Sequence, residues 1–364
     1  MKNTFGNALG LTIFGESHGA AVGAVLDGLA AGLPVDEAYI AERMDRRRAR
    51  GDGLSTARTE PDVVEFLSGV VNGHTTGTPI TMIIRNTNTR SGDYAKTADL
   101  LRPGHADYTA YAKYEGWQDA RGGGHFSGRI TAASVAAGSI CEHILAQRGI
   151  KVYTHIARCA GVEDAPLSSS AGLIMAEPQS GHFALLDPEK EAPMQAAIRA
   201  AGAEGDSVGG ILETVITGVP AGIGEPFFDS VESEIAHLAF AIPAVKGIEF
   251  GAGFAFADLR GSQANDPFTM RDGKVVTATN KNGGINGGIA NGMPIVFRTV
   301  VKPTPSIYKE QDTVDYIAKA DAKLQIKGRH DPCIVPRAAV VQNTLAAFAV
   351  LDLLTVRYGT LGQK

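Results

Sequence analysis

The spacing of apolar and polar residues changes repeatedly along the chain between the two-residue period of β-strands and the longer period of α-helices. Short apolar or alternating runs predict strands at residues 63–71, 80–84, 211–217 and 295–301. Longer periodic segments predict helices at residues 36–48, 129–147, 231–240 and 338–356. The alternation predicts a protein of mixed α and β class, and no linker or low-complexity tract divides it.

The predicted helix at 129–147 is apolar around its whole circumference rather than along one face. Its apolar residues include Ile130, Ala133, Val135, Ala137, Ile140, Ile144 and Leu145. Gly149 is a natural residue for its C-terminal end. A helix with this pattern is buried on all sides, so we expect it in the protein core.

A glycine-rich segment, Gly-Gly-Gly-His-Phe-Ser-Gly at 122–128, leads directly into this helix. The free N–H groups and the dipole at a helix N-terminus attract anions, and Ser127 can cap the helix or contact the anion. Tight turns alone would explain the glycines, but His125, Ser127 and Arg129 accompany them and favour a ligand site. Neither this segment nor the glycine cluster at 283–292 fits the Walker or the dinucleotide-binding pattern, so an ordinary nucleotide fold is not predicted.

The composition limits the kinds of partner that the protein can have. The 364 residues are 44% hydrophobic, enough for a large core, and carry a formal net charge of -5, which argues against nucleic acid as a main partner. The three cysteines are too scattered for a disulfide framework or a zinc site. The sequence contains no run of 18 apolar residues, and no apolar export segment follows Lys2. We therefore expect a soluble, cytoplasmic protein without a membrane partner.

Arginine is concentrated in the predicted helix at 36–48 and just after it. The residues are Arg43, Arg46, Arg47, Arg48 and Arg50, and Arg58 follows. Helical spacing would place Arg43, Arg47 and Arg50 on one face. Carboxylates or phosphates on a ligand or partner would relieve the repulsion between these charges. The alternative is a solvated face, which is the more common explanation of a charge run.

Three loops that are distant in the sequence each combine a histidine with other reactive side chains. They are Gly-Glu-Ser-His-Gly at 15–19, Arg-Pro-Gly-His-Ala-Asp at 102–107 and Gly-Arg-His-Asp-Pro-Cys at 328–333. Imidazole titrates close to neutral pH, so these loops hold candidate proton donors. A flavin- or anion-binding scaffold without turnover would explain the glycines and arginines, but not these loops.

The first of these motifs also has two other interpretations when it is taken alone. It is compatible with a polar turn capped by Ser17, and it formally matches the Gly-x-Ser-x-Gly elbow of serine hydrolases. Only 14 residues precede the motif and no His-Gly-Gly-Gly oxyanion loop is present, which argues against a hydrolase.

These motifs occur in the same order, together with Arg-Gly-Gly-Gly-His at 121–125, in chorismate synthases. The sequence resembles that family over essentially its whole length, and Arg-Gly-Ser at 260–262 and Lys-Pro-Thr-Pro-Ser at 302–306 strengthen the match. The resemblance implies a single α+β domain over residues 1–364, in which antiparallel sheets flank a helical core. It also implies a homotetramer. The polar segment 165–191 is the best candidate for a loop-rich excursion from this domain.

The resemblance implies the last common step of aromatic amino acid biosynthesis. In that reaction 5-enolpyruvylshikimate 3-phosphate loses phosphate and a ring hydrogen by anti 1,4-elimination and gives chorismate. The family uses reduced FMN without net redox change. Some members reduce the flavin themselves with NADPH, whereas others need an external flavin reductase, and we expect the external reductase here because no added reductase domain is evident. No metal is implied.

Site residues also follow from the resemblance, position by position. His18 is similar to the general acid at the leaving phosphate, His105 to the group that protonates the reduced flavin, and Asp331 to the carboxylate that assists proton removal. Ser17 and Ser127 match hydroxyls that shuttle or orient protons. The anion-binding candidates are Arg47, Arg102, Arg129 and Arg337. The flavin-binding candidates are His125, Phe126, Ser127, Pro243, Ala244, Gly287, Lys302, Pro303, Thr304, Pro305, Ser306 and Arg329.

One position departs from the family pattern. Many members have a further arginine six residues after the equivalent of Arg47, where this chain has Gly53. Arg50 and Arg58 are the two candidates to replace it.

Overall fold

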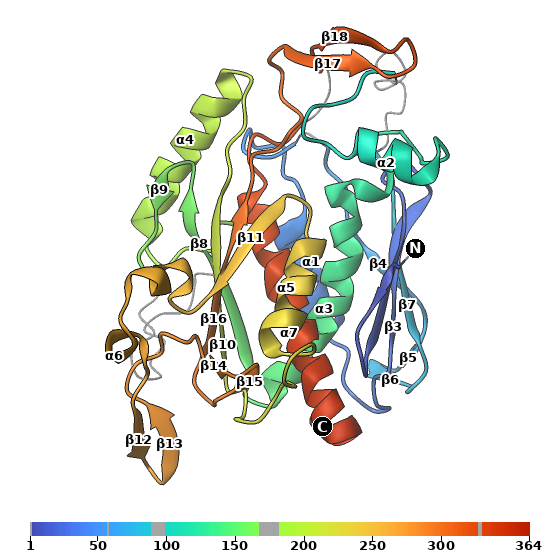
Figure 1. Ribbon diagram of the computed structural model, residues 1–364. Helices are drawn as coiled ribbons and strands as arrows, with labels where there is room; N and C mark the ends of the chain where they lie inside the picture. Colours follow the sequence, from blue (N-terminus) through green and yellow to red (C-terminus); the bar gives the residue numbers. More distant parts are fainter. Residues whose placement is uncertain (1, 57, 89–98, 167–181, 327–329) are drawn as a thin grey trace.

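Two antiparallel sheets enclose a layer of helices (Figure 1). The computed structural model describes residues 2–56, 58–88, 99–166, 182–326 and 330–364. Apolar residues from both sheets and from the helices between them form one hydrophobic cluster, which runs in sequence from Leu9 to Leu354. The expected α+β class, with antiparallel sheets that flank a helical core, is therefore confirmed.

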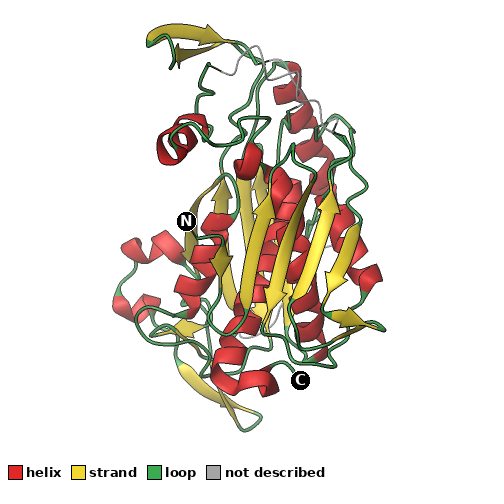
Figure 2. Cartoon of the chain, turned by 90° about the vertical axis from the view of Figure 1, so that its right-hand side faces the viewer, coloured by secondary structure: helices red, strands yellow, loops and turns green. Residues whose placement is uncertain are grey.

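The first sheet has the strand order β1-β2-β3-β7-β4, and Figure 2 looks onto it with the helices behind. Its strands are β1 (Thr4–Phe5), β2 (Gly10–Gly15), β3 (Ala21–Asp27), β7 (Ile80–Arg85) and β4 (Val64–Ser68). The predicted strand at 63–71 is interrupted at Gly69, where φ is +82°. The chain then forms a separate small hairpin of β5 (Val70–Val71) and β6 (His74–Thr75).

The second sheet has the strand order β11-β16-β10-β8-β9. Its strands are β11 (Val245–Phe250), β16 (Ile295–Val301), β10 (Gly210–Thr217), β8 (Lys151–Cys159) and β9 (Val162–Glu163). The predicted strand at 295–301 is confirmed, and the one at 211–217 begins one residue earlier, at Gly210.

Four helices fill the space between the sheets: α1 (Glu37–Arg47), α3 (Thr131–Gln147), α5 (Val231–Ala241) and α7 (Val335–Tyr358). Asp36 and Ser230 cap α1 and α5 by accepting backbone N–H groups. The prediction that α3 is a core helix is confirmed, since 13 of its 17 residues are buried. Gly138 allows α3 to approach α7 closely, because a Cβ atom there would lie 2.5 Å from the carbonyl oxygen of Thr344.

α7 is long and apolar enough to cross a membrane, but 94% of its most apolar window is buried inside the protein. It starts at Val335, three residues before the predicted start, because Pro336 is tolerated in the first helical turn. The burial explains the apolar composition of this helix as that of a core helix.

Smaller elements surround the sandwich. The helices are α2 (Asp107–Tyr114), α4 (Glu191–Ala203) and α6 (Gly261–Ala264), with short 3-10 turns η2 (Gly124–Phe126), η3 (Gly128–Ile130), η5 (Pro188–Lys190), η6 (Gly253–Asp258) and η7 (Gly359–Gly362). The hairpins are β12 (Phe268–Arg271) with β13 (Lys274–Thr277), β14 (Ile285–Asn286) with β15 (Ile289–Ala290), and β17 (Gln311–Asp315) with β18 (Ala320–Leu324). Most of the predicted excursion at 165–191 lies outside the described residues.

Candidate active site

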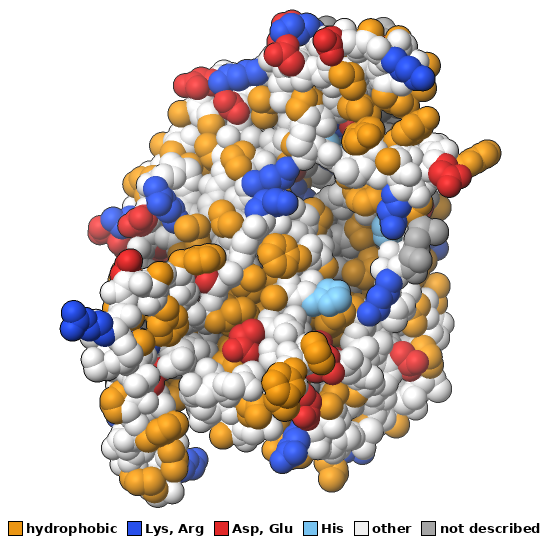
Figure 3. Space-filling model, in the orientation of Figure 1, with side chains coloured by type: hydrophobic (Ala, Val, Ile, Leu, Met, Phe, Trp, Pro, Cys, Tyr) orange, Lys and Arg blue, Asp and Glu red, His pale blue; other side chains and the backbone are white. Residues whose placement is uncertain are grey.

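A cavity of about 580 Å³ opens at one end of the helical layer. The end of α1, the loops before α2, α3 and α7, and the segments after α5 and β16 all contribute to its wall. Figure 3 shows a hollow at this end of the molecule, below the part that carries α2 and beside Lys and Arg side chains. All three histidine loops reach the cavity, through His18, His105 and His330.

His18 occupies the turn between β2 and β3. The neighbouring Ser17 is buried, and its Oγ lies 3.1 Å from His18 Nδ1. A Cβ atom on Gly122 would lie 2.4 Å from His18 Cε1, so only glycine leaves room for the imidazole. The glycine-rich segment also fixes this turn through His125, whose Nδ1 is 2.8 Å from the carbonyl oxygen of Gly15.

His105 is oriented by Asp107. The His105 Nδ1 lies 2.9 Å from Asp107 Oδ1, and Arg102 binds both oxygens of the same carboxylate at 2.6 and 2.8 Å. Burial raises the pKa of Asp107, but the hydrogen bonds from His105 and Arg102 outweigh it and hold that pKa well below its usual range. Asp107 therefore stays ionised and accepts a hydrogen bond from the Nδ1–H of His105. This leaves His105 Nε2 for a ligand.

A buried charge cluster of Arg47, Asp62 and Arg129 forms another part of the wall. Arg47 Nη2 lies 2.5 Å from Asp62 Oδ2, and Arg129 Nη1 binds the other carboxylate oxygen. Burial raises the pKa of Asp62, but the two guanidinium groups lower it further, so the carboxyl stays ionised. Arg47 Nε is shielded and has no hydrogen-bond partner among the described residues. Two cations share one carboxylate here, which leaves an excess of positive charge at the cavity.

Asp331 and Arg337 lie at the start of α7. Arg337 Nη1 lies 2.8 Å from Asp331 Oδ1, which also accepts the Thr56 backbone N–H at 2.9 Å. Arg337 Nε donates to the carbonyl oxygen of Arg47 at 2.8 Å. Thr304 Oγ1 donates to the Asp331 carbonyl oxygen at 2.9 Å. These bonds join α1, the loop after β16 and the start of α7 at one point of the cavity.

The model of the chorismate synthase family matches residues 9–355 of this chain. The chain belongs to the chorismate synthase family. A chorismate synthase from Methanosarcina mazei is 46% identical over 350 residues, which are 96% of this chain and 95% of that protein. One from Archaeoglobus fulgidus is 47% identical over 355 residues, which are 98% of each chain. A crystal structure of a chorismate synthase, 29% identical, superposes with a TM-score of 0.75 and covers 98% of this chain and 94% of that chain.

Membership in the chorismate synthase family makes this protein a carbon–oxygen lyase. Most residues that the family resemblance suggested for catalysis and binding lie around the cavity. The suggested residues that line it are Ser17, His18, Arg47, Arg102, His105, His125, Phe126, Ser127, Arg129, Pro243, Ala244, Lys302, Thr304, Pro305, Ser306, Asp331 and Arg337. They come from seven separate segments of the chain.

Two of the described flavin candidates are not among the lining residues. Gly287 lies in the turn between β14 and β15, and Pro303 lies in the Lys-Pro-Thr-Pro-Ser segment without lining the cavity. Arg329 lies outside the described residues. Their roles in flavin binding stay predictions.

The structure distinguishes the two arginines that could replace the family arginine at Gly53. Arg58 lines the cavity, binds Glu60 at 2.8 and 3.0 Å, and donates to the Ser17 carbonyl oxygen at 2.9 Å. Arg50 instead binds Asp45 on α1 and does not line the cavity. The geometry therefore favours Arg58.

His330 is a cavity residue that the sequence reasoning did not place among the site residues. Its ring packs beside Tyr308, with 5.6 Å between centroids, and its shielded Nε2 has no hydrogen-bond partner among the described residues. Burial, with the nearby Arg102, lowers the pKa of His330 to about 4, so this imidazole is neutral at pH 7. The sequence signal for His330 was its place in the third histidine loop, between the two matched residues Arg329 and Asp331.

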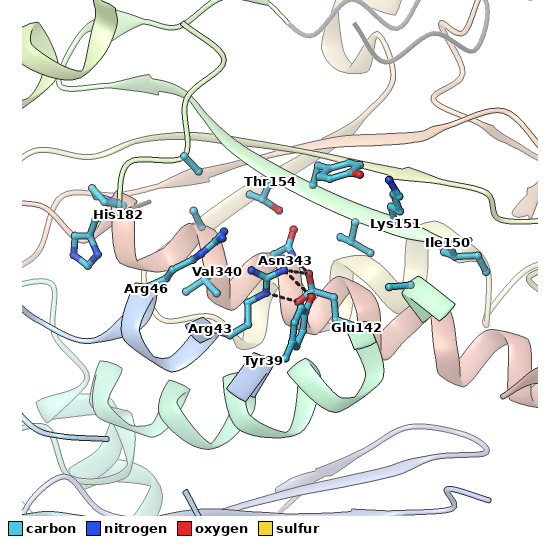
Figure 4. A pocket seen from close by; sticks show the side chains of 16 residues that line it. Tyr39, Arg43, Arg46, Glu142, Ile150, Lys151, Thr154, His182, Val340 and Asn343 are labelled. Atoms are coloured by element: carbon cyan, nitrogen blue, oxygen red, sulfur yellow. Dashed lines mark hydrogen bonds and ion pairs between the residues drawn. The ribbon is translucent and has the colours of Figure 1, made fainter. Parts of the chain in front are cut away.

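Two interpretations from the sequence are wrong in part. α1 ends at Arg47, so Arg50 does not share its face with Arg43. Carboxylates of the protein itself bind every arginine of this run: Arg43 pairs with Glu142 (Figure 4) and Glu42, Arg46 with Glu42, and Arg48 and Arg50 with Asp45. Arg47 pairs with Asp62, which it shares with Arg129. The hydrolase alternative also fails, because Ser17 is followed by strand β3 rather than by the helix of a nucleophile elbow.

Ser127 caps the first turn before α3. Its Oγ accepts the Arg129 N–H at 3.2 Å, and the turn η3 precedes α3. The capping role proposed from the sequence therefore applies to η3, and the helix itself starts only at Thr131.

Proposed function

We propose that this protein converts 5-enolpyruvylshikimate 3-phosphate into chorismate by a 1,4-elimination of phosphate. The observation that carries this proposal is that His18 and His105, from loops far apart in the sequence, line one cavity together with six arginines. The arginines are Arg47, Arg48, Arg58, Arg102, Arg129 and Arg337.

The cation content of the cavity suits a substrate with two carboxylates and one phosphate. Guanidinium groups bind carboxylates and phosphates through pairs of parallel hydrogen bonds. Two guanidinium groups, on Arg47 and Arg129, share the single carboxylate of Asp62 and so retain a net attraction for an anion.

His18 is the proposed general acid. Proton transfer to the departing phosphate makes it a better leaving group, and steps of this kind contribute about 10²–10⁴-fold to rate. Ser17 Oγ, 3.1 Å from His18 Nδ1, orients the imidazole.

Asp331 is the proposed acceptor of the proton that leaves the ring. Its Oδ1 is held by Arg337 and by the Thr56 N–H, so the carboxylate keeps one orientation before substrate arrives. Ser127, which also lines the cavity, supplies a hydroxyl that can relay a proton between neighbouring groups.

Reduced FMN fits the residues that line the cavity. Lys302, which donates to the Gly104 carbonyl oxygen at 2.7 Å, and the Ser306 hydroxyl offer donors, whereas the Thr304 hydroxyl, whose proton goes to the Asp331 carbonyl oxygen, offers an acceptor. The shielded and unpaired Nε2 of neutral His330 offers one more polar contact. When bound, the reduced flavin supplies the electron density that this elimination needs. His105, whose Nδ1 faces the ionised Asp107, would donate a proton from Nε2 as an imidazolium, a cation that this carboxylate stabilises.

The test is turnover under anaerobic conditions with dithionite-reduced FMN. The proposal predicts equal amounts of phosphate and chorismate, and no phosphate release without flavin. Phosphate release without flavin would indicate a hydrolase. Flavin binding without any release would indicate a scaffold and would also overturn the proposal.

The reductant, the assembly and the compartment are further parts of this proposal. We expect an external flavin reductase rather than reduction by NADPH on this chain, so NADPH with oxidised FMN alone should not support turnover. The family resemblance supports a homotetramer. The buried free thiols of Cys141, Cys159 and Cys333 suit the reducing cytoplasm.

A further inference from the structure

Asn86 lies directly after β7 and binds the turn that carries His18. Its side-chain Nδ2 donates to the carbonyl oxygen of Glu16 at 3.0 Å and to that of Gly19 at 2.9 Å. Its backbone N–H donates to the carbonyl oxygen of Ala20 at 3.1 Å. These three hydrogen bonds hold the backbone on both sides of the proposed general acid.

The same side chain also binds an arginine of the cavity wall. The Asn86 Oδ1 accepts a hydrogen bond from Arg129 Nε at 2.8 Å. Arg129 uses its other two nitrogens to bind Asp62 and the carbonyl oxygen of Arg85. One amide group therefore connects the turn of His18 to the buried charge cluster at the cavity.

The chemistry of these neighbours determines which way the Asn86 amide points. A carbonyl oxygen can only accept a hydrogen bond, and a guanidinium N–H can only donate one. The Nδ2 group must therefore face the two carbonyl oxygens, and Oδ1 must face Arg129. A carboxylate has no N–H to donate and a hydroxyl has a single proton, so neither could make the same three side-chain bonds.

Other residues of the cavity wall hold only the earlier part of the same turn. The Arg58 guanidinium and the His125 imidazole bind carbonyl oxygens that precede His18 in the chain, at 2.9 and 2.8 Å. The Asn86 side chain reaches the carbonyl oxygen of Gly19, which follows His18. It therefore restrains a part of the turn that the other two side chains do not bind.

The described residues that line the cavity do not include Asn86, whereas they do include His18 and Arg129. Any effect of Asn86 on the reaction must therefore pass through these two neighbours. A general acid has to lie within about 3 Å of the atom that it protonates. A misplacement of about 1 Å can cost about 100-fold in rate.

We propose that Asn86 is a positioning residue that holds His18 at a fixed place relative to the anion-binding Arg129. The amide binds the backbone of the turn and the guanidinium at the same time, so it sets the position of the acid relative to the site of the departing phosphate. This inference rests on the proposed function, in which His18 is the general acid.

The test is steady-state kinetics of Asn86→Ala under anaerobic conditions with dithionite-reduced FMN. The turn loses both Nδ2 bonds, whereas Arg129 keeps its bonds to Asp62 and to the Arg85 carbonyl oxygen. The value of kcat should therefore fall at least about tenfold, while the KM for 5-enolpyruvylshikimate 3-phosphate should change less than about threefold. An unchanged kcat, with or without a higher KM, would overturn the proposal.

Gln363 provides a matched control, because its amide makes the same set of bonds away from the cavity. Its Nε2 donates to the Gly28 carbonyl oxygen at 3.0 Å and to Thr355 Oγ1 at 3.2 Å, and its Oε1 accepts the Ala30 N–H at 2.6 Å. Gln363→Ala should lower the midpoint of urea denaturation but leave kcat within about twofold of the wild-type value. A similar fall of kcat in both variants would show that lost stability is the cause, and would contradict a positioning role.

Asn86→Asp is a second variant, which keeps the size of the side chain. The carboxylate still accepts from Arg129 but has no N–H for the turn, so kcat should again fall at least about tenfold. The added negative charge beside Arg129 should also raise KM at least about fivefold, unlike in Asn86→Ala. Wild-type kcat in this variant would overturn the inference alone, whereas a wild-type protein that forms no chorismate would overturn the proposed function as well.

Discussion

A Cβ atom on Gly122 would lie 2.4 Å from Cε1 of His18, although more than 100 residues separate the two in the sequence. The glycine belongs to the segment that leads into α3, and the histidine follows β2. The position of the proposed general acid is thus determined by the missing side chain of a distant loop.

Gly122→Ala should therefore reduce turnover at least about 100-fold, because the new methyl group displaces His18 from the cavity. The φ of Gly122 is +66°, so backbone strain adds to the clash. Gly161→Ala is the matched control, since its φ is +83° and a Cβ there meets nothing within 4 Å. Steady-state kinetics with reduced FMN measures both, and equal kcat values in the two variants would contradict the placement of His18.

The choice between Arg58 and Arg50 leads to a second prediction. Arg58→Gln removes a cation from the cavity and should raise the KM for 5-enolpyruvylshikimate 3-phosphate about 10- to 100-fold. Arg50→Gln removes only an exposed pair with Asp45 and should change KM less than twofold. The reverse order of the two effects would assign the missing family contact to Arg50.

The buried carboxylate of Asp62 should make a large contribution to the stability of the folded protein. Asp62→Asn leaves the buried guanidinium groups of Arg47 and Arg129 without their shared carboxylate, which should lower the free energy of unfolding by about 3–5 kcal/mol. Glu65→Gln breaks the exposed pair with Arg85 and should cost less than about 1 kcal/mol. Urea denaturation monitored by circular dichroism gives both values. A similar loss in both variants would argue against the buried cluster.

His330 should make the protein less stable in mild acid. Its pKa is lowered from the usual 6.5 to about 4 in the folded protein, so the unfolded chain binds a proton between these values that the folded protein does not. Stability from this residue is therefore present above pH 6.5 and is lost as the pH falls toward 4.

The variant His330→Asn should not show this loss of stability at acidic pH. The free energy of unfolding of the wild-type protein should fall between pH 7 and pH 5 by about 2 kcal/mol more than that of the variant. Parallel stability profiles in this pH range would show that the His330 imidazole is not held neutral.

The sequence was informative where a local pattern determines the structure. The all-round apolar pattern of 129–147 predicted the core helix α3, and the motif order predicted which loops would meet. The partners of the arginines could not be predicted. Arg43 binds Glu142, 99 residues away, and Arg129 binds Asp62, 67 residues away. No periodicity encodes such contacts, because they depend on how α1, α3 and the loop before β4 pack together.

The contact that places Arg58 in the cavity also could not be predicted from the sequence. Its position five residues after Gly53 suggested it only as one of two alternatives. Its hydrogen bond to the Ser17 carbonyl oxygen, which places it in the cavity, spans 41 residues and is visible only in the folded protein.

The central claim is that His18 and His105 act as proton donors in one cavity. The most direct measurement is the anaerobic rate of chorismate formation by His18→Ala and His105→Ala with dithionite-reduced FMN. Circular dichroism should show that both variants are folded, because neither side chain belongs to the hydrophobic cluster. The account predicts that each rate falls at least about 100-fold below that of the wild-type protein. Rates close to the wild-type value in both folded variants would contradict it.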